Sequence, residues 1–130
     1  MQRFAPGEWA KNTDYRMRVV RLETCEVEPY FAPLPGHEKL GIFVELEGLN
    51  KVDVPVNVLH GHLTDGDGRS YAPATAGCRP TLPAGRISQG KTARGFISFE
   101  IPVTSRGLTL EYHPTIVGRA PQRLYFDLPR

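Results

Sequence analysis

The sequence predicts an all-β protein, built as an antiparallel sandwich of about seven short strands. Apolar residues recur at every second position in several segments, which is the period of a half-buried strand. The 13 glycines and 12 prolines fall mainly between these segments, where they indicate turns. Proline also interrupts nearly every window long enough for an amphipathic helix, so helices are not expected.

The first two predicted strands cover residues 15–27 and 39–49. In the first, the apolar positions include Val19, Val20 and Leu22. The second has the clearest alternation in the chain, with one face made by Leu40, Ile42, Val44 and Leu46. This alternation predicts a strand with one face in the core and the other mostly in water.

A hairpin is predicted after a third strand over residues 54–64. The next four residues are Asp-Gly-Asp-Gly, and Asp-Gly pairs supply the positive φ angles that tight turns require. A short return strand is expected over 69–72. Residues 73–85 are expected to form a loop around Cys78.

Three more strands are predicted over residues 92–101, 108–113 and 123–128. Their inward positions are Ile97, Phe99, Ile101, Leu108, Leu110, Tyr112, Leu124, Phe126 and Leu128. Short strands separated by turn signals are typical of a sandwich. A chain of 130 residues suits one domain, which we place at 15–130 behind an N-terminal arm at 1–14.

An ordered set of motifs over residues 39–128 carries a family resemblance. The motifs are GIFVELEGLN at 41–50, LTDGDGRSY at 63–71, GFISFEIP at 95–102, LEYHP at 110–114 and LYFDL at 124–128. In this order they resemble the DUF4352 family, which is related to the MPT63-type secreted antigens of mycobacteria. The resemblance implies an immunoglobulin-like β-sandwich and an exported or envelope-associated protein. It brings no established catalytic residues.

Net charge and hydropathy indicate which partners and locations the sequence favours. The net charge is only +2, and the one basic cluster, Arg16, Arg18 and Arg21, is followed by three glutamates, so no nucleic-acid partner is predicted. No apolar run is long enough to span a membrane. Residues 1–11 lack the apolar region of a signal peptide. The extracytoplasmic location is therefore implied by the resemblance alone, and a cytoplasmic location stays open.

Two cysteines, Cys25 and Cys78, stand 53 residues apart, and no CxxC motif is present. They are candidates for a disulfide, which would stabilise by about 4 kcal/mol for a loop of this length. Two buried thiols are the alternative. The spacing does not favour zinc binding or thioredoxin-like chemistry.

Two metal sites are considered. His60 and His62 are two positions apart, so on one strand they would share a face and could ligate zinc, copper or nickel. A third ligand would come from His37 or His113. Both rings facing solvent is the alternative. Asp65 and Asp67 resemble the start of a calcium loop, but the twelfth position is Ala76 rather than Glu, which favours a plain hairpin turn.

No catalytic constellation is recognisable, so an enzyme is not predicted and no cofactor is expected. Glu45 and Glu47 are interpreted as solvated charges, and no serine lies in a GxSxG setting. Trp9, Phe43 and Phe96 are the candidates for an exposed binding surface, since aromatic residues favour interfaces. We therefore expect a non-enzymatic binding module with a protein partner. A metal-binding protein and a structural accessory subunit are the alternatives.

Overall fold

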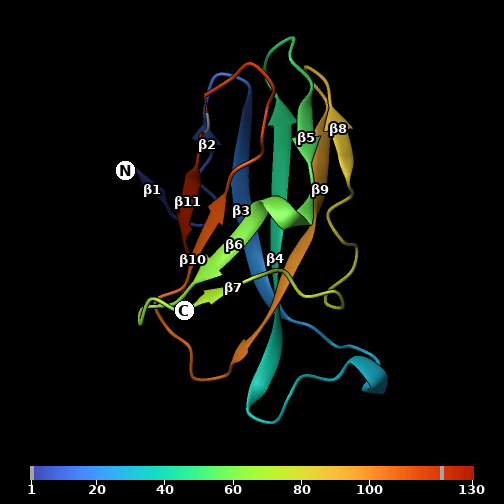
Figure 1. Cartoon of the computed structure of the whole chain (residues 1–130), viewed down its shortest axis with the longest axis vertical. Helices are drawn as coiled ribbons and strands as arrows, with labels where there is room; N and C mark the ends of the chain where they lie inside the picture. Colours follow the sequence, from blue (N-terminus) through green and yellow to red (C-terminus); the bar gives the residue numbers. More distant parts are fainter. Residues whose placement is uncertain (1, 121) are drawn as a thin grey trace.

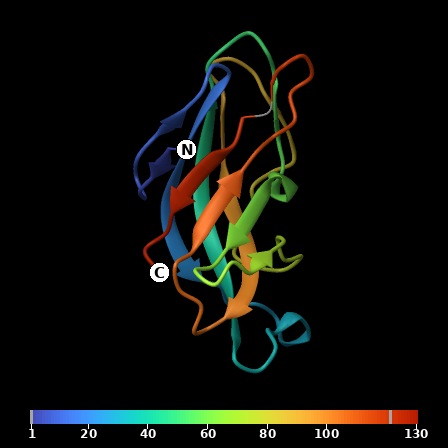
Figure 2. The same cartoon turned by 60° about the vertical axis from the view of Figure 1, so that its left-hand side comes forward.

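The computed structural model describes residues 2–120 and 122–130 (Figures 1 and 2). In this part of the chain, eleven strands form two larger sheets and one small sheet. Between the strands of this described part lie two short 3-10 turns, η1 (Pro29–Phe31) and η2 (Val58–His60). Among the described residues, no helix has the length and apolar character needed to cross a membrane.

The four-stranded sheet has the order β2-β3-β4-β9 and is antiparallel throughout. Its strands are β2 (Ala10–Lys11), β3 (Tyr15–Thr24), β4 (His37–Gly48) and β9 (Thr92–Pro102). A bulge between Val19 and Arg21 shifts the pairing of β3 with β4. Because one extra residue reverses the alternation of faces, Arg21 lies on the same outer face as Arg16 and Arg18.

The five-stranded sheet has the order β1-β11-β10-β6-β7. Its strands are β1 (Arg3–Phe4), β11 (Leu124–Asp127), β10 (Thr109–Tyr112), β6 (Gly61–Thr64) and β7 (Ser70–Tyr71). The pairing of β1 with β11 is parallel, and the others are antiparallel. Residues 1–14, expected as an arm, thus contribute one short strand to each large sheet.

The predicted strand over residues 54–64 is wrong as a single element. The chain forms β5 (Val54–Val56), then η2, then β6. The Asn57 side chain accepts a hydrogen bond from the Leu59 N–H at 2.9 Å, and this bond stabilises the 3-10 turn that breaks the strand. As a result β5 does not continue β6 in the five-stranded sheet. It pairs instead with β8 (Gly85–Ile87) in the small sheet.

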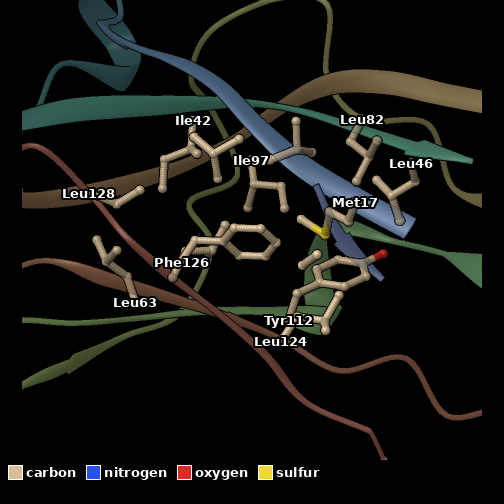
Figure 3. Close-up of a cluster of buried hydrophobic side chains, with 14 of the residues drawn as sticks. Met17, Ile42, Leu46, Leu63, Leu82, Ile97, Tyr112, Leu124, Phe126 and Leu128 are labelled. Carbon is tan, nitrogen blue, oxygen red and sulfur yellow. The ribbon is translucent and has the colours of Figure 1, made fainter. Parts of the chain in front are cut away.

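Side chains from both large sheets meet in one hydrophobic core (Figure 3). The four-stranded sheet contributes Met17, Ile42, Leu46 and Ile97, and the five-stranded sheet contributes Leu63, Tyr112 and Phe126, all fully buried. Each large apolar side chain removed from water in this way stabilises the fold by about 2 kcal/mol. The prediction of an all-β antiparallel sandwich is confirmed, with every predicted strand other than 54–64 present as one element.

Candidate functional site

A disulfide joins Cys25, just after β3, to Cys78 in the loop before β8, with the two Cα atoms 4.8 Å apart. The bond crosses the outer face of β4 at Gly41, where any Cβ would overlap the Cys78 sulfur. We call residues 73–82 the strap, because this segment runs along β9 and is tied across the sheet by the disulfide. The outer face of the sandwich is therefore partly covered.

Backbone hydrogen bonds hold the strap against β9. The Ala74 N–H donates to the Ser98 carbonyl at 2.7 Å, and the Cys78 N–H donates to Ser98 Oγ at 3.1 Å. Further along, the Leu82 N–H donates to the Phe96 carbonyl at 3.0 Å. These bonds fix the strap independently of the disulfide.

Residues 26–36, which we call the arch, project from the lower end of the molecule in both cartoon views (Figures 1 and 2). The arch carries η1, and the Tyr30 and Phe31 rings meet edge to face at 5.2 Å. Tyr30 is 90% exposed and Phe31 is 46% exposed. Two large aromatic rings in water at one end of a small protein are a feature of interaction sites.

The far end of the arch is fixed to the sheet. The Leu34 N–H donates to the Glu100 carboxylate at 3.3 Å, and the Lys39 ammonium lies 3.3 Å from the same side chain. The hydrogen bond from Leu34, helped by Lys39, lowers the pKa of Glu100. A carboxylate that stays charged at neutral pH keeps this anchor in place.

A groove of about 460 Å³ lies between the arch and the strap. Its lining residues are Glu26, Val27, Glu28 and Phe31 from the arch and Thr75, Ala76, Gly77, Arg79 and Thr81 from the strap. The disulfide joins the two walls, because Cys25 precedes the arch and Cys78 lies within the strap. We call this hollow the arch–strap groove, and it is the candidate functional site.

His60 and His62 do not share a strand, so the geometric premise of the predicted metal site is wrong. His60 ends η2, and its Nδ1 lies 3.5 Å from the Tyr112 hydroxyl, whereas His62 lies in β6 opposite Glu111. Burial and the nearby His113 lower the pKa of His60. In the described part of the chain, no three His, Cys, Asp or Glu side chains gather closely enough to hold a metal. Metal binding by this pair stays a prediction.

Asp65 has a structural role in the hairpin turn. Its Oδ1 accepts hydrogen bonds from the Asp67 N–H at 2.9 Å and the Arg69 N–H at 3.0 Å. Its Oδ2 accepts a third from the Tyr71 hydroxyl at 3.1 Å. Both oxygens are therefore engaged within the turn, which agrees with the hairpin interpretation that was preferred over calcium.

Phe43 and Phe96 do not form the exposed surface that was predicted. They are 7% and 3% exposed, and their rings meet edge to face at 4.9 Å. The Arg21 guanidinium lies over both rings, 4.4 Å from Phe43 and 5.5 Å from Phe96. Pairing of Thr81 with Phe96 brings the strap alongside. Arg21 and the strap, which is distant in sequence, thus shield both rings from water.

Trp9, the third predicted surface residue, is half-buried beneath two arginines. The guanidinium carbons of Arg16 and Arg18 lie 4.0 Å and 4.6 Å from the ring centroid. These arginines also form ion pairs with Glu47 at 2.7 Å and Glu45 at 3.0 Å. Charged side chains paired with glutamates therefore cover the Trp9 ring, so the face around it is not an open apolar patch.

The arch itself was missed as a site from the sequence. A usable signal was present in residues 29–35, PYFAPLP, where three prolines exclude a regular strand while two aromatics and one leucine remain. Because such a segment cannot enter a sheet, its large apolar residues tend to stay exposed, and exposed apolar residues are candidates for a binding surface.

The family described as a domain of unknown function, DUF4352, matches residues 5–122. No curated protein matches the chain. Several solved structures do match, although at identities that establish the fold alone.

Three of these structures illustrate the similarity. The MPT63 secreted protein of Mycobacterium tuberculosis has a TM-score of 0.71 and 17% identity, covering 97% of this chain and 96% of its own. The yjhA protein of Bacillus subtilis has a TM-score of 0.69 and 19% identity, covering 95% and 99%. The putative lipoprotein ycdA of Bacillus subtilis has a TM-score of 0.75 and 14% identity, covering 92% of this chain but 38% of its own. Together with the family match over residues 5–122, the motifs and the fold lead to one assignment: the chain belongs to the DUF4352 family.

Proposed function

We propose that this chain is a non-catalytic binding module that acts outside the cytoplasm and takes its ligand in the arch–strap groove. The observation that carries the proposal is the exposed Tyr30–Phe31 pair standing beside a hollow of about 460 Å³. Aromatic rings contribute much of the energy of protein interfaces, because they bury a large area at a small cost in conformational entropy.

The chemistry of the lining supports binding rather than catalysis. Among the described residues that line the groove there is no serine and no histidine, and both cysteines of the chain are bonded. The polar side chains there are those of two glutamates, two threonines and one arginine. Such a set orients a ligand through charge and hydrogen bonds.

The disulfide supports a location outside the cytoplasm. Disulfides persist in oxidising compartments and are rare in the cytosol, where thiols are kept reduced. Two fold relatives are described as a secreted protein and a putative lipoprotein. Alkylation of thiols in intact source cells tests this location: we expect Cys25 and Cys78 to resist the reagent unless a reductant is added. Predominant alkylation without reductant would contradict it.

Photocrosslinking tests the use of the groove. Tyr30 is replaced by benzoylphenylalanine, which keeps an aromatic ring at the same exposed position, and the full chain is irradiated in its source cells. The control places the same group at Val117, which is 95% exposed but lies outside the lining of the groove. We expect a defined adduct from position 30 and none from position 117. Equal labelling at both positions, or none at either, would refute the proposal.

A further inference from the structure

Part of the main chain on each wall of the groove lacks hydrogen-bond partners among the described residues. On the arch, the backbone groups of Glu26 and Val27 form no hydrogen bond with another described residue, although the Cys25 N–H just before them donates to the Lys39 carbonyl at 2.7 Å. On the strap, the same holds for Thr75, Ala76 and Gly77, which lie between the bonded residues 74 and 78. Two facing segments with unpaired N–H and C=O groups can pair with a third polypeptide.

The conformation of these walls suits such pairing. Glu28 has φ −63° and ψ 151°, so the chain entering η1 is extended. Three consecutive strap residues in the lining, Thr75, Ala76 and Gly77, are small. Gly77 lies so close to Ser98 that a Cβ there would overlap its side chain. The strap is therefore flat against β9, which leaves the groove open to a main chain.

The apolar part of the groove is on the arch. Val27 is half-buried, and Phe31 is 46% exposed, so a ligand side chain can remove the rest of that ring from water. On the strap wall, Ala76 adds a small apolar contact. One apolar side chain of the ligand thus has a defined place against Phe31 and Val27.

Unpaired carboxylates make the groove negatively charged. Glu26 and Glu28 are exposed and have no ion pair among the described residues, whereas nearby Glu38 and Glu100 are paired with Arg130 and Lys39. Arg79 is the single basic residue of the lining. Two carboxylates against one guanidinium leave an acidic rim, which is complementary to a cationic side chain.

We infer that the arch–strap groove binds an extended polypeptide segment of a partner protein, in which an apolar side chain stands next to a lysine or arginine. The apolar side chain packs on Phe31, the basic one pairs with Glu26 and Glu28, and the main chain pairs with the two walls. This inference rests on the proposed function and names its ligand class. An acidic rim disfavours an anionic membrane surface or a nucleic acid as the occupant.

Peptide display on the full, oxidised chain tests the ligand class. A library of random twelve-residue peptides is selected against the protein, and enriched sequences are synthesised. We expect them to share a Lys or Arg beside a Phe, Leu, Ile or Val. Their affinity for the chain should fall as salt is raised, because an exposed ion pair is screened.

Matched variants then locate the binding. We expect E26Q/E28Q and, separately, F31A to weaken the selected peptides about tenfold, the loss typical of an interface residue worth about 1.4 kcal/mol. The control D53N/D67N also removes two exposed carboxylates without an ion pair among the described residues, and V103A truncates an exposed apolar side chain elsewhere. Both controls should bind as the parent does. Thermal unfolding of each variant shows that it is folded.

Several results would overturn the inference: no enrichment from the library, enriched peptides without a basic residue, or affinities unchanged by both groove substitutions. The crosslink at position 30 separates this failure from failure of the proposed function. An adduct with a glycan, a lipid or a small molecule would keep the binding module and reject the polypeptide ligand. Absence of both peptide binding and a crosslink would reject the two together.

Discussion

Gly41 is the residue on which the close crossing of the disulfide over β4 depends. A Cβ at this position would overlap the Cys78 sulfur and crowd the Cys25 sulfur. We expect G41A to lower the free energy of unfolding by about 1–3 kcal/mol, the usual cost of forcing an extra methyl group into a packed region. Urea unfolding of the oxidised chain measures this effect.

A double-mutant cycle provides the control for Gly41. When Cys25 and Cys78 are both replaced by alanine, the two sulfurs that the new methyl group would meet are absent. The cost of G41A should then be clearly smaller than in the parent chain. An equal cost in both backgrounds would show that the strap and the disulfide are not what requires glycine here.

Tyr15 has a buried hydroxyl that makes no hydrogen bond of good geometry among the described residues, although the Asn12 side chain lies beside it. Removing an unsatisfied buried polar group relieves its desolvation cost, so we expect Y15F to stabilise the protein by about 1 kcal/mol at pH 7. Urea unfolding at pH 7 checks this. A loss of stability would indicate that the hydroxyl is satisfied in solution.

The same residue gives a prediction for alkaline pH. Burial, followed by the neighbouring Tyr112, raises the pKa of Tyr15 above its ordinary value of 10.0, and burial raises the pKa of Tyr112 as well. The unfolded chain therefore loses these protons near pH 10 while the folded chain keeps them, so stability falls as pH rises above about 10. Unfolding free energies from pH 8 to 11 should decline less steeply in Y15F than in the parent.

Sequence patterns identified which side of a strand a residue faces but not what covers it. Phe43 and Phe96 point outward, as their alternation predicts, yet Arg21 and the strap bury them. Arg21 reaches that face only through the bulge next to Val19. Neither the bulge nor the contact with a segment distant in sequence leaves a local signal that could be recognised beforehand.

At the scale of elements, strands with a strong alternation of apolar and polar residues could be predicted from the sequence. Strands whose ends depend on a side-chain hydrogen bond, or whose existence depends on a partner strand, could not. The β4 and β9 strands follow from periodicity and end near glycine or proline. The split of residues 54–64 follows from Asn57, which competes for the backbone in a way that an apolar pattern conceals. The short β8 forms because β5 leaves an edge for it to pair with.

The hairpin between β6 and β7 should depend on the side chain of Asp65 and not on that of Asp67. D65A removes the acceptor for two backbone N–H groups and the Tyr71 hydroxyl, whereas the Asp67 side chain makes no such contact. We expect D65A to lower the unfolding free energy clearly more than D67A, in parallel urea titrations. Since both Asp65 oxygens are engaged in the turn, added calcium should leave the midpoint of thermal unfolding unchanged. A rise of that midpoint with calcium, lost in D65A, would restore the calcium hypothesis.

The strap and the arch form one unit through the disulfide. A bond that closes a loop of 53 residues should contribute about 4 kcal/mol, because it restricts the unfolded chain. We expect the C25A/C78A variant to be less stable by about this amount in urea, with the β9 side of the strap still held by its hydrogen bonds. Equal stability of parent and variant would show that the bond does not constrain the chain as described.

Across the whole molecule, the sandwich and the groove arise from different kinds of information. The sandwich needs apolar residues with period two, and many sequences meet this requirement. The groove needs two segments some fifty residues apart, near Cys25 and Cys78, to come together. The disulfide, which the sequence left undecided, and the hydrogen bonds of the strap to β9 both contribute to this arrangement. This is why the fold and family could be predicted while the location of the candidate site could not.

The most direct test of the groove compares crosslinking at position 30 in two chains within the source cells. One chain keeps the disulfide, and the other carries C25A/C78A, which removes the covalent tie between the arch and the strap while leaving Tyr30 exposed on the arch. If the ligand is held between arch and strap, the adduct formed by the first chain should be strongly reduced in the second, at equal levels of folded protein. An adduct of undiminished yield would contradict the account, because the ligand would then be recognised by the arch alone.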